Sequence, residues 1–318
     1  MAIPYYPGCT LSTRGRGYDA SGRAVAKALG LELQELQDWN CCGATFPLSM
    51  DNLLAMAGPA RVLAGARAQG ERVATLCAIC YNVLKRTNHF LQGDAEKRER
   101  INHFIEAQYA GDLRVQHFLE VLRDELGFQA LRQRVEEARE ATGRSLEGLK
   151  VAPYYGCLLL RPQKELQLDD AEDPHILEDL LQALGCQPVD FSHRVECCGS
   201  YLLVTSAELA ADMSFGVLQS AARSAADLLV TACPLCQYNL DYRQAEMARQ
   251  HPGFQPLPVL YFTQLMGLAL GLDATDWGWE LHHVDPRPVL TEHGYGQVFG
   301  VRRSEFGGGP QRTPNSEP

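Results

Sequence analysis

The tripeptide Cys-Cys-Gly occurs twice in this chain, and each copy is surrounded by three further cysteines at matching distances. A single cysteine precedes each tripeptide, by 31 residues in the first copy and by 39 in the second, and a Cys-x-x-Cys pair follows after 34 residues in both. The two sets are Cys9, Cys41, Cys42, Cys77 and Cys80, and Cys157, Cys197, Cys198, Cys233 and Cys236. Ten of the 11 cysteines are used in this way, so the pattern indicates an internal duplication with one eight-residue insertion.

The duplication predicts two compact halves. The chain has 318 residues, of which 46% are hydrophobic, so each half has an ordinary domain length and enough apolar residues for its own core. We expect a first cysteine-rich domain with a helical bridging segment over residues 1–147, a second over 148–290, and a flexible tail over 291–318.

Both halves show the same alternation of strand and helix patterns. The predicted strands are residues 2–6, 31–36 and 72–76, then 149–155, 187–191 and 227–232. The predicted helices are residues 21–29, 50–68 and from 81 onward, then 173–184, with Asp173 as N-cap, 207–225 and from 237 onward. Residues 88–148 are predicted to be a largely helical bridge without a clear counterpart, including helices over 115–126 and 129–141. The fold class expected is α/β, with two pseudo-symmetric cysteine-rich lobes whose short parallel sheets are flanked by helices.

The charge balance excludes some classes of partner. The formal net charge of −10 and the pI near 5.4 argue against a nucleic acid or an anionic membrane surface as partner. The N-terminal residues have no signal-peptide pattern, and no apolar run is long enough to span a membrane. We therefore expect a cytoplasmic protein, in which cysteines are metal ligands or redox groups more often than disulfides.

The positions of the cysteines favour a metal cluster. Cys80 and Cys236 are predicted where a helix begins, and free N–H groups there lower a thiol pKa. A Cys-x-x-Cys turn can direct two sulfurs at one metal centre, and the other cysteines come from the ends of neighbouring parallel strands. Five cysteines including an adjacent pair are awkward for one tetrahedral zinc ion but suit a centre with several irons.

The complete pattern resembles the cysteine-rich CCG domain, and two intact copies over about residues 3–285 resemble the B subunit of heterodisulfide reductase. The resemblance implies that each set of five cysteines binds one non-cubane [4Fe-4S] cluster, so that all ten motif cysteines are metal ligands. It also implies that a small-molecule disulfide is bound and reduced between two facing clusters, with no separate catalytic side chain assigned. The chain contains no ferredoxin cysteine run, GxGxxG fingerprint or P-loop. By resemblance, electrons would come from the ferredoxin-like C subunit and the flavin-containing A subunit of such a reductase.

Two other functions are compatible with the pattern. One is a CCG-type iron–sulfur electron-transfer subunit of a hydroxyacid or glycerol-phosphate dehydrogenase complex, by resemblance to such subunits. The other is a zinc-stabilised scaffold without enzymatic activity.

Several residues outside the motifs have simpler explanations. Cys186 occupies an apolar position of the duplicated frame and is predicted to be core. His193 is expected to be structural or solvent-facing, and His282, His283 and His293, with Trp277 and Trp279, are expected to serve packing or a subunit contact. Tyr81-Asn82 and Tyr238-Asn239 are one residue out of register between the copies, so they cannot have equivalent roles.

Overall fold

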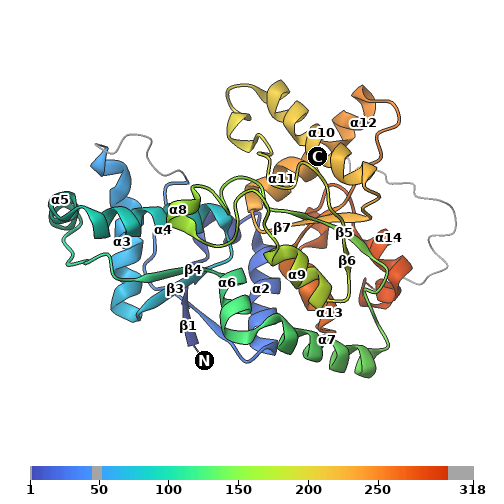
Figure 1. The fold of residues 1–318 in the computed structure, drawn as a ribbon, viewed down its shortest axis with the longest axis horizontal. Coiled ribbons are helices and arrows are strands. Elements are labelled where there is room, and N and C mark those ends of the chain that lie inside the picture. The colour runs from blue at the N-terminus through green and yellow to red at the C-terminus, as the bar shows by residue number, and fades with distance from the viewer. Residues whose placement is uncertain (1, 45–51, 300–318) are drawn as a thin grey trace.

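The computed structural model describes residues 2–44 and 52–299 and contains two lobes, each built on its own four-stranded parallel sheet (Figure 1). The first sheet has the order β2-β1-β3-β4 and the second the order β6-β5-β7-β8. The strands are β1 (Ala2–Tyr5), β2 (Glu32–Glu35), β3 (Arg72–Thr75), β4 (Arg114–His117), β5 (Lys150–Tyr154), β6 (Gln187–Pro188), β7 (Leu228–Thr231) and β8 (Val259–Tyr261). Since both sheets have the same order and all pairings are parallel, the predicted α/β class and pseudo-symmetry are confirmed.

Helices connect the strands, as parallel pairing requires. In the first half they are α1 (Gly8–Leu11), α2 (Arg16–Ala28), α3 (Leu53–Gln69), α4 (Ala78–Gly93), α5 (Ala95–Ile105), α6 (Phe118–Val121) and α7 (Phe128–Thr142), with a π-helical turn at Leu122–Leu126. In the second half they are α8 (Gln163–Leu166), α9 (Ile176–Ala183), α10 (Ala207–Arg223), α11 (Pro234–Tyr242), α12 (Gln244–Gln250), α13 (Phe262–Ala269) and α14 (Arg287–Leu290). Short helical turns lie at Ser200–Leu202, Trp279–Leu281, Thr291–Tyr295 and Gly296–Phe299.

The bridging segment differs from the prediction, because its first part is a strand. The predicted helix over 115–126 begins as β4, which pairs with β3, and α6 follows. The segment also has a counterpart, since β8 and α13 repeat β4 and α6. Both helices begin with a capping box, formed by His117 with Glu120 and by Tyr261 with Gln264. The pattern was missed because β4 is only four residues long and directly adjoins a helix.

The predicted start of the helix after Cys157 is also corrected. Helix α9 begins at Ile176, and Asp173 does not cap it; its carboxylate pairs instead with Arg194. The free N–H groups of His175 and Ile176 donate to the Asp169 carboxylate, at 2.8 and 2.7 Å. A carboxylate further back in the chain therefore satisfies these N–H groups.

The two lobes share a continuous core. Helix α2 of the first half packs along α13 of the second, between the two sheets in Figure 1. Ser21 and Thr263 meet there with hydroxyl oxygens 2.7 Å apart, and the rings of Tyr18 and Tyr261 stack at 4.2 Å. Cys186 is buried in the core, as predicted. Thr291–Phe299 is helical with Tyr295 buried, and the rest of the predicted tail lies outside the described residues.

Candidate metal centre

The ten motif cysteines lie at the carboxyl ends of the two sheets. Cys77 follows β3 and is the N-cap of α4, and Cys233 follows β7 and is the N-cap of α11. Helices α4 and α11 begin three residues earlier than the predicted starts at 81 and 237, so Cys80 and Cys236 lie in the first turn of a helix. Free N–H groups in this turn favour negative charge on sulfur, but contact with neighbouring thiols and burial outweigh them and raise the pKa of both Cys80 and Cys236.

The structure brings four of the five sulfurs of each copy together in two pairs. In the first copy the Sγ atoms of Cys9 and Cys41 are 3.7 Å apart, and those of Cys42 and Cys80 are 3.6 Å apart. In the second copy, the Sγ atoms of Cys157 and Cys197 are 3.8 Å apart, and those of Cys198 and Cys236 are 3.4 Å apart. The same pairing in both copies agrees with the duplicated spacing. Over residues 2–44 and 52–299, no three Cys, His, Asp or Glu side chains are grouped as one metal ion would require.

Local contacts favour a thiolate on one cysteine in two of these pairs, whereas burial and contact with neighbouring thiols raise the pKa of the other paired cysteines for which a shift is resolved, namely Cys41, Cys80, Cys157, Cys198 and Cys236. Gly43 N–H donates to Cys41 Sγ and Gly199 N–H donates to Cys197 Sγ, both at 3.4 Å. Contact with the Cys80 thiol lowers the pKa of Cys42 to about 7. Hydrogen bonding from Cys157 and Cys198 lowers the pKa of Cys197 well below its ordinary value. A thiolate is the form that binds metal, so the chemistry of these donors suits a soft metal centre.

Two glycines leave room beside the sulfurs. Gly8 has φ +73°, and a Cβ there would lie 2.7 Å from Cys80 Sγ. Gly156 has φ +64°, and a Cβ there would lie 3.3 Å from Cys236 Sγ. Both precede the first cysteine of their copy, so the backbone approaches the sulfurs as closely as only glycine allows. Sequence reasoning overlooked them, although a Gly-Cys dipeptide at the end of both first strands was a usable signal.

The two sets meet at the boundary between the lobes. Ala78 N–H donates to Ala232 O at 3.1 Å, which joins the two Cys-x-x-Cys turns. Tyr18 Oη donates to Leu76 O at 2.6 Å and lies 3.3 Å from Ala232 O. These contacts hold Cys77 and Cys233 at facing sheet ends.

Tyr201 closes the same boundary from the outer side. Its hydroxyl donates to Ala44 O at 2.7 Å, which connects the loop after Cys198 to the loop after Cys42. Burial raises the pKa of the Tyr201 hydroxyl, and nearby cysteines of both sets raise it further. The ring therefore lies close to both sets. With Ile79 and Leu235 it lines a small hollow over Cys157 and Cys197. Nothing in the sequence pattern pointed to Tyr201, because the first half has Thr45 at the corresponding position.

The other polar residues considered from the sequence lie elsewhere. His193 is half-buried, with Nδ1 2.9 Å from Ser192 Oγ, and has no contact with a motif sulfur in the described part of the chain. His282 is buried against Trp279, consistent with packing. The out-of-register pairs do have different roles, since Asn82 donates to Leu158 O and Asn239 donates to Cys198 O.

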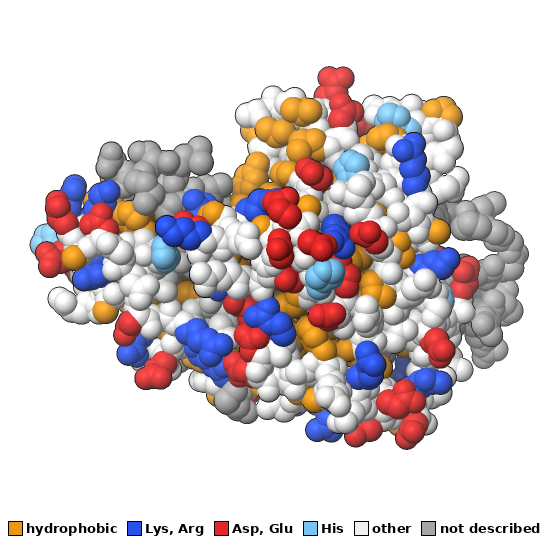
Figure 2. All heavy atoms as spheres, in the orientation of Figure 1, with side chains coloured by type: hydrophobic (Ala, Val, Ile, Leu, Met, Phe, Trp, Pro, Cys, Tyr) orange, Lys and Arg blue, Asp and Glu red, His pale blue; other side chains and the backbone are white. Residues whose placement is uncertain are grey.

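Charged side chains on the face seen in Figure 2 are of mixed sign, with acidic and basic groups side by side. None of the helices within residues 2–44 and 52–299 combines the length and apolar character that a membrane span needs.

Comparison with known proteins identifies relatives over most of the chain. The family model of the cysteine-rich (CCG) domain matches residues 3–85 and 151–241. The 8-methylmenaquinol:fumarate reductase membrane anchor subunit of Wolinella succinogenes is 35% identical, over 88% of this chain and 96% of that protein. The B subunit of the ferredoxin/F(420)H(2)-dependent CoB-CoM heterodisulfide reductase of Methanosarcina acetivorans is 28% identical, over 87% of this chain and 92% of that protein.

A solved structure shares the fold. The crystal structure of a hypothetical protein from Helicobacter pylori superposes with a TM-score of 0.69 at 12% identity, over 88% of this chain. The chain spans about half of that protein, 51% of its length. Two matches to the domain model and full-length relatives together show that this chain belongs to the cysteine-rich CCG domain family, among the two-domain proteins that include the B subunits of heterodisulfide reductases.

Proposed function

We propose that the chain is the disulfide-reducing subunit of a heterodisulfide reductase-like complex. In this proposal Cys9, Cys41, Cys42, Cys77 and Cys80 hold one non-cubane [4Fe-4S] cluster, and Cys157, Cys197, Cys198, Cys233 and Cys236 hold the other. The observation that carries the proposal is the junction of the two Cys-x-x-Cys turns, where Ala78 N–H donates to Ala232 O. Because this bond joins the residue after Cys77 to the residue before Cys233, it supports a site at which one small molecule contacts both sets.

The donor set of each copy supports an iron–sulfur centre. Five thiols follow the strand ends of each sheet, N–H groups of Gly43 and Gly199 point at sulfur, and Gly8 and Gly156 let the backbone pass close to Cys80 and Cys236. When bound, clusters of this kind would supply electrons one at a time and iron sites that can bind sulfur.

The reaction sets the requirements on the protein. Reduction of a disulfide breaks one S–S bond, takes up two electrons and two protons, and releases two thiols. The side chains of Ile79, Tyr201 and Leu235 line one hollow with the half-buried Cys157 and Cys197. The Tyr201 hydroxyl, held on Ala44 O, keeps the two Cys-Cys-Gly loops at a fixed separation. The electrons come from partner proteins, for which we propose a ferredoxin-like C subunit and a flavin-containing A subunit.

A second candidate is an electron-transfer role without disulfide chemistry, as in the CCG subunits of dehydrogenase complexes. The specific observation in its favour is the 35% identity to the Wolinella succinogenes subunit, whose name describes the membrane anchor of a methylmenaquinol:fumarate reductase. In that case the two sets would relay electrons between a quinol and a partner.

The test is anaerobic purification followed by iron, sulfide and zinc analysis and EPR, before and after addition of a thiol to the oxidised protein. Disulfide reduction predicts about eight irons per chain and a paramagnetic signal that appears only with thiol. The electron-transfer role predicts iron without a thiol response, and zinc without iron contradicts both.

Cysteine variants assign the ligands. Cys41→Ser and Cys197→Ser are each expected to lower the iron content and to abolish the thiol-dependent signal of one centre. Cys186→Ser is the matched control, because this thiol is buried in the core away from both sets and burial raises its pKa. An equal loss of iron in Cys186→Ser would show that the effect is on folding.

A further inference from the structure

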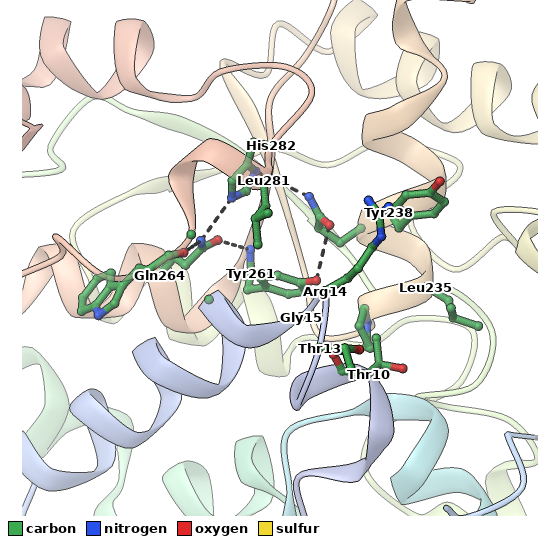
Figure 3. Close-up of a pocket in the computed structure, with 15 residues that line it drawn as sticks. Thr10, Thr13, Arg14, Gly15, Leu235, Tyr238, Tyr261, Gln264, Leu281 and His282 are labelled. Carbon is green, nitrogen blue, oxygen red and sulfur yellow. Dashed lines mark hydrogen bonds between the residues drawn. The ribbon is translucent and has the colours of Figure 1, made fainter. Parts of the chain in front are cut away.

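A pocket of about 320 Å³ lies between the lobes, beside the candidate metal centres. The first half contributes the turn from α1 to α2, and the second contributes α11, β8, α13 and the turn at Trp279–Leu281 (Figure 3). We call it the interlobe pocket and define it by Arg14, Leu235, Gln237, Tyr238, Leu281 and His282, which line it with nine other residues. Thr10, next to Cys9, and Pro234, next to Cys233, are among these others, so the pocket adjoins both cysteine sets.

The pocket breaks the pseudo-symmetry of the fold. On the opposite side of the boundary the corresponding space beside α4 is filled by α8 and the residues around it. Tyr81 Oη donates to Leu166 O at 2.9 Å, and Asn82 Nδ2 donates to Leu158 O and Arg161 O. The segment between Cys157 and α9 carries the eight-residue insertion, whereas the shorter turn after Cys9 leaves the equivalent space beside α11 open. The residues at the positions of Tyr81 and Asn82 in the second copy, Gln237 and Tyr238, line the pocket.

Leu235 connects the pocket to the metal centre. It lies between Cys233 and Cys236 and lines both the interlobe pocket and the hollow over Cys157 and Cys197. Leu235 therefore separates the pocket from the hollow that the motif cysteines of the second set line. Leu235 is half-buried and aliphatic, so its side chain donates and accepts no hydrogen bond at this boundary.

The floor of the pocket is polar but uncharged. Gln264 Nε2 donates to Trp277 O at 3.0 Å and lies 3.1 Å from His282 Nε2, and Gln237 Oε1 accepts from Tyr261 Oη at 3.3 Å. Burial lowers the pKa of His282 to about 4, so the imidazole is neutral at physiological pH. The remaining walls are largely apolar, with Leu235, Leu281 and aromatic rings.

A single cation lies at the rim, among the residues that line the pocket. Arg14 reaches from the α1–α2 turn toward Tyr238, with its guanidinium carbon 5.8 Å from the ring centroid (Figure 3). In the described part of the chain no carboxylate pairs with Arg14, and Glu280, next to Leu281, is paired with Arg16 instead. The pocket thus offers an apolar body and one guanidinium, which suits an elongated molecule with an anionic end.

We propose that the interlobe pocket binds the organic part of one of the two thiols of the disulfide, an apolar chain whose anionic end pairs with Arg14. This inference rests on the proposed function only for the role of the sulfur. Binding of an anionic apolar molecule in the pocket does not depend on it. Because only one side of the boundary is open, the two halves of the disulfide bind in unlike surroundings, and Arg14 selects which half enters the pocket.

The test uses the cluster-loaded chain under anaerobic conditions and measures binding by calorimetry. The probes are 8-mercaptooctanoate, its uncharged counterpart 8-mercaptooctanol, and octanoate, which has no sulfur. Arg14→Gln is expected to weaken both anions about tenfold, as for loss of one charge-assisted contact, and to leave the alcohol unchanged. Leu281→Trp, which fills the pocket, is expected to weaken all three.

Arg249→Gln is the matched control, since Arg249 on α12 is exposed, lies outside the pocket and changes the net charge equally. Equal effects of Arg14→Gln and Arg249→Gln, or normal binding to Leu281→Trp, would overturn the proposal. A third result would also overturn the proposal: Leu281→Trp weakens binding of the alcohol alone, and Arg14→Gln has no effect on binding of the anions. That result would point to an uncharged occupant such as a quinone ring.

Failure of the proposed function gives a different result. In that case octanoate binding still depends on Arg14 and Leu281, whereas addition of 8-mercaptooctanoate produces no thiol-dependent EPR signal. Conversely, Leu281→Trp could give a thiol-dependent EPR signal with the amplitude and thiol affinity of the unsubstituted protein. That result would support the disulfide chemistry and show that the pocket takes no part in it.

Discussion

Ala78 N–H donates to Ala232 O at 3.1 Å, so the residue after Cys77 is hydrogen-bonded to the residue before Cys233. The reciprocal bond cannot form, because the residue that corresponds to Ala78 in the second copy is Pro234, which has no N–H. The carbonyl that would have accepted it, Leu76 O, instead accepts from the Tyr18 hydroxyl and lies 2.8 Å from His117 Nε2. Side chains of the first half thus take the place of the second backbone hydrogen bond that a symmetric junction would have.

Tyr18→Phe is expected to lower the free energy of unfolding by about 1–2 kcal/mol, because a buried carbonyl at the junction loses one of its donors. Chemical denaturation of the anaerobic protein checks this value. Tyr242→Phe is the control, since that side chain is 41% exposed and its hydroxyl donates no hydrogen bond among the described residues. Equal destabilisation by both substitutions would contradict the role given to Tyr18.

Gly8→Ala is expected to reduce iron binding in the first set, because the added Cβ would lie 2.7 Å from Cys80 Sγ. Iron per chain should fall to about half, with the second set unaffected. Gly30→Ala separates this clash from backbone strain, since Gly30 has a similar φ of +76° and open space around its Cβ position. The interpretation fails if Gly30→Ala loses as much iron.

His117 should make the protein less stable as the pH falls. Burial lowers its pKa to about 3, so the folded state holds a neutral ring while the unfolded chain takes up a proton near pH 6.5. The stability contribution is therefore complete above about pH 6.5 and is lost as the pH falls toward 3, by up to about 1.4 kcal/mol per pH unit. His117→Gln should flatten the dependence of unfolding free energy on pH between 5 and 7. His103→Gln, at an exposed position, should leave it unchanged.

Asp241 should make the protein less stable as the pH rises, which is the opposite of the effect of His117. Burial raises its pKa to about 7, although the N–H groups of His283 and Val284 donate to its carboxylate. Its contribution is complete below about pH 4 and is lost as the pH rises toward 7, because the unfolded carboxyl ionises first. Asp241→Asn should remove this decline in unfolding free energies measured from pH 4 to 7. The exposed Asp276→Asn serves as control, and an identical pH profile in both variants would show that Asp241 does not cause the decline.

The sequence predicted the parts of this protein that depend on periodic pattern. The duplicated cysteine spacing led to two α/β halves, and apolar runs located strands such as β1 and β7 within two residues. Cys186 was correctly assigned to the core, because an apolar position in a repeated frame needs no further information.

The missed features depend on contacts between distant segments. β4 is a strand because β3 lies beside it, and four residues carry too weak a pattern to reveal that pairing. Asp169 caps α9 from outside the expected cap position. Arg14 and Tyr201 matter because the other lobe lies opposite them, and no local motif encodes that arrangement.

The segment around α8 has a consequence for how a molecule of this kind can arise. In a homodimer of single cysteine-rich domains, any insertion would enter both copies and fill both sides of the boundary at once. Fusion of the two copies into one gene removes that constraint, because each copy can then mutate separately. The extra residues after Cys157, anchored on Asn82, occur in one copy alone and fill one side of the boundary, whereas the interlobe pocket lies on the other.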